Sequence, residues 1–307
     1  MTQAVEVEVE GRSLRLSNLD KVLYPQAGFT KAQVIDYYTR VAPAVLPHLR
    51  GRPLTLKRYP NGVEEGHFYE KECPSHRPQW VHTEAVPIRS EDRVVDFCIA
   101  DDVPTLVWLA NLADLELHTS LSLAVPIERP TILAFDLDPG PPAAVLECAE
   151  VALALRELLA PLGLEGYVKT SGSKGLQVYF PLNTKTTYEQ TKPFALAVAQ
   201  LLERRRPALV VSSMRKDLRA GKVLVDWSQN DQHKTTVSVY SLRARERPTV
   251  STPVTWDEVE GCLEADDPEL LRFETGAVVE RISEHGDLFA PTLEREQPLP
   301  ELGRRRR

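Results

Sequence analysis

Two kinds of hydrophobic periodicity occur in the amino-terminal third of the chain. Apolar and charged residues alternate over positions 4–16, which predicts one half-buried strand. Thr30 is a suitable N-cap for a helix over 31–49, where apolar residues recur at helical spacing. A polar, turn-rich segment follows at 50–93, and a second apolar helix with a proline at its start is expected over 104–118. The pattern indicates an amino-terminal α/β lobe.

The middle of the chain has the most regular pattern. Apolar runs rich in β-branched and aromatic residues alternate with segments of strong helix formers. The six predicted elements are a strand at 131–138, a helix at 143–160, strands at 166–170 and 176–182, a helix at 188–206 and a strand at 222–230. This β-α-β-β-α-β order is that of the ferredoxin-like or RRM-like fold, an antiparallel sheet backed by two helices. The expected fold class is α+β.

We expect a single domain of two packed lobes, because the chain contains no internal repeat and no long flexible linker. The first lobe would span about 1–125 and the second about 126–300, with a basic tail at 301–307. No apolar stretch approaches the ~20 residues of a membrane-spanning helix, and the acidic amino terminus is unlike a secretory signal. The four cysteines are scattered without a CxxC pair, which favours reduced thiols in the cytoplasm.

Charge is distributed unevenly along the chain. The 307 residues carry a formal net charge of −7, which taken alone argues against binding to a polyanion. Residues 201–247 nevertheless contain eleven Lys or Arg against five Asp or Glu, whereas 251–303 contain three against fourteen. The acidic carboxyl-terminal part thus conceals a basic middle segment. That segment is either an ordinary solvated surface or a face for nucleic acid.

Three aspartates lie at the ends of predicted strands. Asp136 and Asp138 are one residue apart, so alternation places both carboxylates on one face. Asp226 ends the strand expected to lie beside theirs. Adjacent carboxylates repel each other and usually need a cation, and Mg²⁺ or Mn²⁺ prefers such oxygen ligands. Three of them can hold two ions for a two-metal reaction on a phosphate. The alternative is that they are ordinary turn and strand-end aspartates.

Polar groups suited to phosphate occur near these strands. Ser171 and Lys174 belong to the segment SGSKG, whose glycines allow backbone N–H groups to approach an anion. The segment lacks the P-loop pattern and could equally be a plain hairpin turn. Basic and amide residues flank Asp226 in sequence and would bind a triphosphate or a template backbone, unless they are simple surface residues. They are Arg219, Lys222, Gln229, Lys234 and Arg243.

Three further features have two interpretations each. His118 follows the second predicted helix and is either a ligand or a buried core histidine. Phe68 and Tyr69 form either an exposed platform on which a base stacks or part of a core strand. The histidines that follow Cys73 do not match a common zinc spacing, so a zinc site is disfavoured.

Several blocks of the sequence, in order, resemble a known family. They are LSNLDKVLYP, RYPNG, FYEK, FDLDPG, TSGSKGLQVYFPL and LRAGKVLVDWSQN, followed by KTT and YSLR. Together they resemble the polymerase domain of bacterial ligase D, which belongs to the archaeo-eukaryotic primase superfamily. The resemblance extends over about 13–290 and implies a primase-like catalytic palm in the second lobe. It also implies a nucleotidyltransferase that extends DNA 3′ ends with two Mn²⁺ or Mg²⁺ ions.

The resemblance assigns roles residue by residue. The catalytic metal ligands would be Asp136, Asp138 and Asp226. The incoming nucleotide would contact Lys57, Arg58, His118, Ser171, Lys174, Gln229 and Arg243. A 5′-phosphate across a gap would contact Asn18, Lys21 and Lys31, while Arg219 and Lys222 would lie on the nucleotide or primer side. Phe68 and Tyr69 would stack on a base, with tyrosine where the family often has phenylalanine.

The family serves non-homologous end joining and tends to prefer ribonucleotides. The expected partners are DNA with 5′-phosphorylated gaps or 3′ overhangs and NTP or dNTP, with Ku and a separate DNA ligase as candidates. The expected location is the bacterial cytoplasm, at the nucleoid and not at a membrane. Ligase and nuclease blocks are not seen, so the chain is either a stand-alone polymerase or part of a longer protein.

Other functions stay open as alternatives. The chain could be a stand-alone polymerase that fills gaps or primes synthesis in excision repair, or mainly a module that bridges DNA ends. A phosphatase of the haloacid-dehalogenase type also begins with an apolar strand and DxD. It fits less well, because Pro139 follows the pair and the later blocks do not match.

Overall fold

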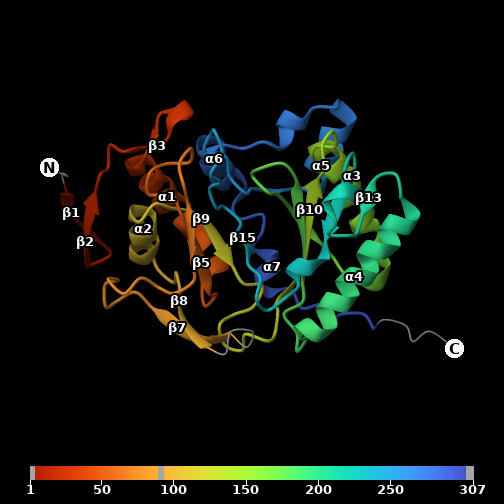
Figure 1. The fold of residues 1–307 in the computed structure, drawn as a ribbon, viewed down its shortest axis with the longest axis horizontal. Helices are drawn as coiled ribbons and strands as arrows, with labels where there is room; N and C mark the ends of the chain where they lie inside the picture. Colours follow the sequence, from red (N-terminus) through yellow and green to blue (C-terminus); the bar gives the residue numbers. More distant parts are fainter. Residues whose placement is uncertain (1–3, 89–92, 302–307) are drawn as a thin grey trace. The chain divides into compact units, whose positions relative to one another are not determined.

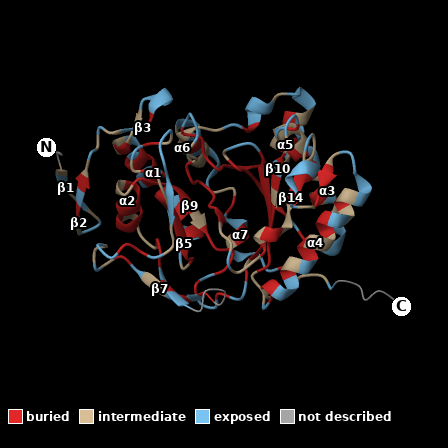
Figure 2. Cartoon of the chain, viewed as in Figure 1, coloured by how far each residue is buried: buried red, intermediate tan, exposed pale blue. Residues whose placement is uncertain are grey.

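The computed structural model describes residues 4–88 and 93–301 and divides into two compact units (Figure 1). Unit 1 consists of Met1–Val125, Thr235–Thr252 and Phe273–Asp287. Unit 2 consists of Pro126–Lys234, Pro253–Arg272 and Leu288–Arg307. In each unit the central strands are buried and the outer turns of the helices are exposed (Figure 2).

Unit 1 contains a six-stranded antiparallel sheet in the order β15-β9-β5-β8-β7, with β6 also paired to β5. Its strands are β5 (Leu54–Arg58), β6 (Phe68–Glu70), β7 (Thr83–Ile88), β8 (Arg93–Cys98), β9 (Asp114–Thr119) and β15 (Thr236–Val237). Alternate apolar residues of β5 and β9 are buried, and Leu56 lies opposite Leu117. The residues between them, including Lys57 and Glu116, therefore lie on the other face.

Three helices belong to unit 1, namely α1 (Lys31–Leu49), α2 (Val103–Asn111) and α6 (Thr275–His285). The predicted start of α1 is confirmed, because Thr30 and Gln33 form a capping box that satisfies two free backbone N–H groups. Its buried face packs against α2 and α6. Among the described residues, no helix of either unit is both long and apolar enough to cross a membrane.

Two predictions for the amino-terminal part are wrong. The alternating stretch 4–16 forms a hairpin, β1 (Ala4–Val9) and β2 (Arg12–Ser17), because Glu10 and Gly11 take positive φ angles that reverse the chain. A second short pair, β3 (Val22–Tyr24) and β4 (Phe29–Thr30), precedes α1. The second helix ends at Asn111, and His118 lies on β9 because pairing with β5 overrides the helical pattern.

Two segments that follow most of unit 2 in the sequence belong to unit 1. The sequence pattern places 235–252 and 273–287 in the second lobe, but both belong to unit 1. Hydrogen bonding accounts for this difference, because β15 pairs with β9 and Val250 N donates to Phe273 O. Sequence patterns along one strand do not reveal which distant strand it joins.

Unit 2 confirms the predicted α+β core. Its sheet has the order β13-β14-β10-β12-β11-β16, and the four inner strands are antiparallel in the ferredoxin-like order. The strands are β10 (Ile132–Pro139), β11 (Tyr167–Thr170), β12 (Leu176–Pro181), β13 (Val210–Val211), β14 (Val223–Asp226) and β16 (Pro253–Val254). The helices are α3 (Val145–Leu159), α4 (Tyr188–Arg205), α5 (Trp256–Ala265) and α7 (Pro291–Glu294). Figure 1 shows α3 and α4 beside this sheet, and both contact β10.

The prediction that all four cysteines are reduced is wrong for two of them. Cys73 and Cys98 form a disulfide with their Cα atoms 4.9 Å apart. Cys73 N also donates to Asp96 O, which holds the segment after β6 beside β8 and brings the two sulfurs together. Cys148 and Cys262 are buried free thiols. The two cysteines are 25 residues apart and match no short sequence motif, so their pairing could not be predicted from the sequence.

A close approach of two strands explains a glycine in the SGSKG turn. A Cβ atom at Gly175 would lie 1.9 Å from Leu137 O, a backbone atom of β10. We expect Gly175→Ala to lower the melting temperature by several degrees, since the turn would have to move away from β10. Gly261→Ala is the matched control, because the space at Gly261 in α5 is open and alanine favours the helix. Equal melting temperatures for the two variants, measured by circular dichroism, would contradict this packing.

Candidate active site

The register between β10 and β14 brings two of the predicted aspartates together. Asp136 lies directly opposite Asp226, and Asp138 follows on the same face of β10. Burial, together with the negative charge of Asp226, raises the pKa of Asp136 to about 6. Opposed, half-buried carboxylates are electrostatically unfavourable unless a cation joins them.

Asp226 is held by the short turn that follows β14. Its Oδ1 accepts hydrogen bonds from the backbone N (2.9 Å) and the Oγ (2.6 Å) of Ser228. Its Oδ2 accepts one from Gln229 Nε2 at 2.9 Å. Lys234 Nζ donates to the same Ser228 hydroxyl. The structure therefore places Gln229 on a carboxylate that it would orient, whereas the resemblance assigns it to the nucleotide.

Asp138 lies at the exposed end of the site. Arg219 Nη1 is 3.7 Å from its Oδ2, and Arg219 Nη2 donates to Met214 O. Lys222 points elsewhere, since its Nζ donates to Pro207 O. Of the two cations assigned to the nucleotide or primer side, the structure brings only Arg219 to the carboxylates.

The donor set fits a hard divalent cation. Carboxylate oxygens are the ligands that Mg²⁺ and Mn²⁺ prefer, and the repulsion between Asp136 and Asp226 is relieved by such an ion. In the described part of the chain, no three His, Cys, Asp or Glu side chains yet converge on one point. Asp138 would have to turn from Arg219 to join the pair.

The SGSKG segment is a tight turn between β11 and β12, as predicted. Ser171 N donates to Gly175 O, and the Ser171 Oγ accepts from the backbone N of Ser173 and of Gly175. Ser171 is buried, whereas Lys174 is exposed at the tip. The hydrogen bonds of Ser171 therefore fix the backbone of the turn, and the exposed Lys174 side chain extends from it.

Unit 1 carries a compact basic cluster on β5, β9 and the segment after β15. Its centre is Glu116, whose side chain is only 2% exposed. Glu116 Oε2 lies 3.1 Å from Lys57 Nζ, 3.0 Å from His118 Nε2 and 3.4 Å from Arg243 Nε. Its Oε1 accepts from Ala244 N at 3.0 Å. One carboxylate thus gathers three residues predicted to bind the nucleotide.

The charges in this basic cluster follow from burial and pairing. Burial alone would raise the pKa of Glu116, but the hydrogen bond from His118 and the charge of Arg243 hold that pKa far below its usual range. Burial lowers the pKa of His118, so the imidazole is neutral at pH 7 and donates to Glu116. Burial opposes the charged form of Lys57, yet the carboxylate of Glu116 raises the pKa of Lys57.

The structure separates residues that are neighbours in sequence. Lys57 Nζ lies over the rings of Tyr59 and Tyr69, whereas the Arg58 guanidinium lies over Phe68 and donates to Glu70. The cause is strand alternation, since Lys57 and Arg58 are successive residues of β5 and point to opposite faces. The pairing also shifts there, because Lys57 faces Glu116 and Arg58 faces Asp114, which leaves Leu115 of β9 without a partner on β5.

The aromatic pair on β6 is exposed, which excludes the interpretation as a core strand. Phe68 is 43% and Tyr69 58% exposed. Successive strand residues point to opposite faces, so the two rings cannot form one platform. Tyr69 is the ring that accompanies the basic cluster, with its centroid 6.1 Å from that of His118.

The three residues assigned to a 5′-phosphate also lie together in unit 1. Lys21 N donates to Asn18 O, and Lys31 N donates to Lys21 O. Lys31 is 5% exposed, and its Nζ donates to Ser17 O at 2.7 Å. Burial, together with the charges of Lys21 and Arg58, lowers the pKa of Lys31 to about 8. Crowded cations of this kind are stabilised by an anion.

Two residues considered for a zinc site have other partners in the structure. Cys73 is disulfide-bonded and therefore cannot act as a thiolate ligand. His82 is instead paired with Asp101 at 2.7 Å and Glu84 at 3.1 Å. No cluster of three metal-binding side chains occurs there among the described residues.

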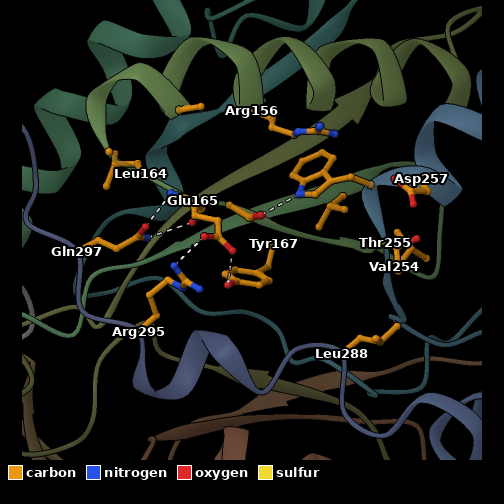
Figure 3. Close-up of a pocket in the computed structure, with 15 residues that line it drawn as sticks. Arg156, Leu164, Glu165, Tyr167, Val254, Thr255, Asp257, Leu288, Arg295 and Gln297 are labelled. Carbon is orange, nitrogen blue, oxygen red and sulfur yellow. Dashed lines mark hydrogen bonds and ion pairs between the residues drawn. The ribbon is translucent and has the colours of Figure 1, made fainter.

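A pocket of about 770 Å³ in unit 2 lies apart from these residues (Figure 3). None of the predicted site residues lines it. Figure 3 shows Glu165 bonded to both Arg295 and Tyr167, and Arg156 is paired with Glu260 outside the view. Both arginines of the pocket have carboxylate partners.

Sequence reasoning missed Glu116, the residue at the centre of the basic cluster. A signal was present, because Asp114, Glu116 and His118 alternate with leucines as on a strand. The helix expected over 104–118 includes this segment, and in a helix alternate residues do not share one face. Burial raises the pKa of Asp114 well above its usual range, and its Oδ1 accepts from Lys57 N beside the bulge in β9.

The sequence of the chain is similar to those of known proteins. A family model described as LigD, primase-polymerase domain, matches residues 30–289. The chain is 43% identical over 294 residues to the multifunctional non-homologous end joining protein LigD of Mycolicibacterium smegmatis, covering 93% of this chain and 37% of that protein. It is 32% identical over 277 residues to the bifunctional non-homologous end joining protein LigD of Bacillus subtilis, covering 90% of this chain and 43% of that one. The chain spans less than half the length of these relatives.

A solved structure shares the fold. The polymerase domain from Mycobacterium tuberculosis ligase D, in complex with DNA, matches with a TM-score of 0.83 and 43% sequence identity. The match covers 91% of this chain and 98% of that one. On both sequence and fold, the chain belongs to the LigD primase-polymerase family of metal-dependent DNA nucleotidyltransferases.

Proposed function

We propose that the chain extends DNA 3′ ends and fills short gaps under the direction of a template, using NTPs in preference to dNTPs. The observation that carries this proposal is the opposed pair Asp136 and Asp226, with Asp138 beside them. The family relation supports it, and the names of the relatives support a role in non-homologous end joining. DNA in the matched ligase D structure supports DNA as the substrate.

The proposed mechanism uses two Mn²⁺ or Mg²⁺ ions held by Asp136, Asp138 and Asp226. Such ions activate the attacking 3′-hydroxyl and stabilise the leaving pyrophosphate. Gln229 and the Ser228 hydroxyl keep the Asp226 carboxylate in one orientation.

The basic cluster of unit 1 is proposed to bind the triphosphate. Lys57 and Arg243 would neutralise its charge, since both are already desolvated and held by Glu116. His118, neutral and bonded through Nε2, would use Nδ1 to accept a hydrogen bond from the nucleotide. In the SGSKG turn, Lys174 would contact phosphate from the exposed tip while Ser171 holds the backbone.

A second phosphate site is proposed at Asn18, Lys21 and Lys31. It would hold the 5′-phosphate on the far side of a gap and position the DNA without reading its sequence. Arg58 pairs with Glu70 and would contact the nucleotide, and its charge also acts on Lys31. Tyr69 would stack on a base beside the basic cluster.

This second phosphate site also favours a further role in holding two DNA ends together. In cells we propose Ku and a DNA ligase as partners, because a filled gap must be recognised and then sealed. The site of action would be the bacterial cytoplasm, where the nucleoid lies.

The carboxylate pair gives the direct test of the polymerase reaction. We expect Asp136→Ala and Asp226→Ala to reduce primer extension to background with Mn²⁺ or Mg²⁺, because each removes half of the opposed pair. DNA binding, measured by fluorescence anisotropy, should stay within about twofold. Glu296→Ala, an exposed carboxylate of unit 2, is the control and should extend normally. Full extension by either aspartate variant would refute the assignment of the metal ligands.

The buried carboxylate of unit 1 should control nucleotide affinity. In Glu116→Gln the anchoring charge for Lys57 and Arg243 is lost, so we expect KM for the nucleotide to rise about tenfold with a smaller change in kcat. Steady-state primer extension measures both constants. Glu128→Gln is the control, because it makes the same chemical change at an exposed residue that does not belong to the basic cluster. An unchanged KM in Glu116→Gln would show that the cluster does not bind the nucleotide.

The lowered pKa of Lys31 predicts a pH dependence. The ammonium is charged below its pKa of about 8 and neutral above it, so phosphate affinity at this site should fall as pH rises. We expect the preference for gaps with a 5′-phosphate over a 5′-hydroxyl to decrease between about pH 7 and 9. Lys31→Arg should keep its preference over that range, because guanidinium stays charged. The ratio of extension on the two substrates cancels other pH effects, and parallel curves for the two proteins would contradict the role of Lys31.

A further inference from the structure

A row of four polar side chains crosses the sheet of unit 2. Asp226 on β14 lies opposite Asp136 on β10, Asp136 lies opposite Gln177 on β12, and Gln177 lies opposite Lys169 on β11. Directly opposed residues of neighbouring strands point to the same face of a sheet. The row, named here the charge row, therefore runs from two carboxylates through one amide to one ammonium.

Hydrogen bonds join the members of the charge row. Lys169 Nζ donates to Gln177 Oε1, and the Gln177 side chain donates in turn to Asp136. Because the lysine occupies the amide oxygen, the amide NH₂ is the group that faces Asp136. Lys169 is fully buried and Gln177 is 3% exposed, so both side chains are held in place by packing. Lys169 thus fixes which end of the amide the carboxylate meets.

Electrostatics explains why a lysine is buried at this position. An ammonium taken out of water is strongly unfavourable unless opposite charge is near, and the two carboxylates of the charge row supply that charge. In return, Lys169 reduces the mutual repulsion of Asp136 and Asp226 when no cation is bound. A divalent cation at the carboxylates is repelled by the same lysine.

We infer that Lys169 is a positioning residue whose charge, acting across Gln177, stabilises the metal-free carboxylate pair and weakens its affinity for divalent cations. The inference rests on the proposed function in one respect, namely that Asp136 and Asp226 are the metal ligands. A weak bare site has a consequence for the reaction. The carboxylates would then hold the ions firmly only when a triphosphate adds its own negative charge, so metal and nucleotide would be taken up together.

The test is the affinity for Mn²⁺ without nucleotide or DNA, measured from the electron paramagnetic resonance signal of the free ion at one fixed pH. Lys169→Met removes the charge and keeps the apolar stem, and we expect it to bind Mn²⁺ at least about tenfold more tightly. The estimate follows from Coulomb's law across two strand spacings, which is roughly 10 Å.

Two substitutions of Gln177 separate charge from hydrogen bonding. Gln177→Glu makes the charge row one unit more negative without removing the lysine, and it should also tighten Mn²⁺ binding. Gln177→Met breaks the same hydrogen bonds but leaves the charge unaltered, so it should not tighten binding. Lys192→Met is the control for loss of a lysine elsewhere in unit 2, because Lys192 pairs with Asp231. It should bind Mn²⁺ like the unaltered protein.

The outcomes are distinct. Tighter binding in Lys169→Met and Gln177→Glu, but not in Gln177→Met, supports the inference. Unchanged or weaker binding in both charge variants overturns it while leaving the proposed polymerase intact. If Lys169→Met does not fold, Gln177→Glu alone decides. If Asp226→Ala binds Mn²⁺ as well as the unaltered protein, the metal ligands are wrong and the inference fails with them.

Discussion

The antiparallel register of β10 against β14 is the constraint on which the chemistry of unit 2 depends. It sets Asp136 and Asp226 directly opposite each other, and burial with the charge of Asp226 raises the pKa of Asp136 to about 6. Stability alone would not select such a pair, because like charges at opposed positions are destabilising. The neighbouring groups reduce the repulsion from both sides, with Ser228 and Gln229 donating to Asp226 and Gln177 donating to Asp136. Negative charge remains at the pair, and a cation would neutralise it.

In unit 1 the crowded charges are positive, and their repulsion is likewise reduced by a neighbouring group of opposite charge. Lys57, His118 and Arg243 are crowded onto one face of the sheet, and a single buried carboxylate, Glu116, holds all three. Lys169 is the counterpart in unit 2, a single buried cation behind two carboxylates. In both units, one buried charge of opposite sign reduces the repulsion among the like charges of the cluster when no ligand is bound. It also leaves a net charge with which a ligand can interact.

Much of unit 2 could be predicted from the sequence, because its elements are long and their periodicity is clear. The order of strands, the neighbouring positions of Asp136 and Asp226 and the SGSKG turn all follow from that pattern. Unit 1 was harder for physical reasons. The turn at Gly11 interrupts an alternation that continues on both sides of it, and β9 has a sequence compatible with a helix until it pairs with β5. The Cys73–Cys98 disulfide depends on a strand pairing that no local pattern encodes.

Glu116 and Lys169 escaped prediction for a related reason. Each is a single charged residue within a short strand, and the ordinary expectation is that such a side chain faces solvent. Its role becomes clear only from the residue that lies opposite it on the neighbouring strand. The function is therefore encoded in register, and register must be held against slippage, because a shift of one residue would turn Asp226 to the other face. Hydrogen bonds from Gly140 N to Lys222 O and from Gly221 N to Gly140 O hold it at the end of β10. A Cβ at Gly140 would lie 2.0 Å from Arg219 O, so a side chain at this position would displace the backbone that holds the register.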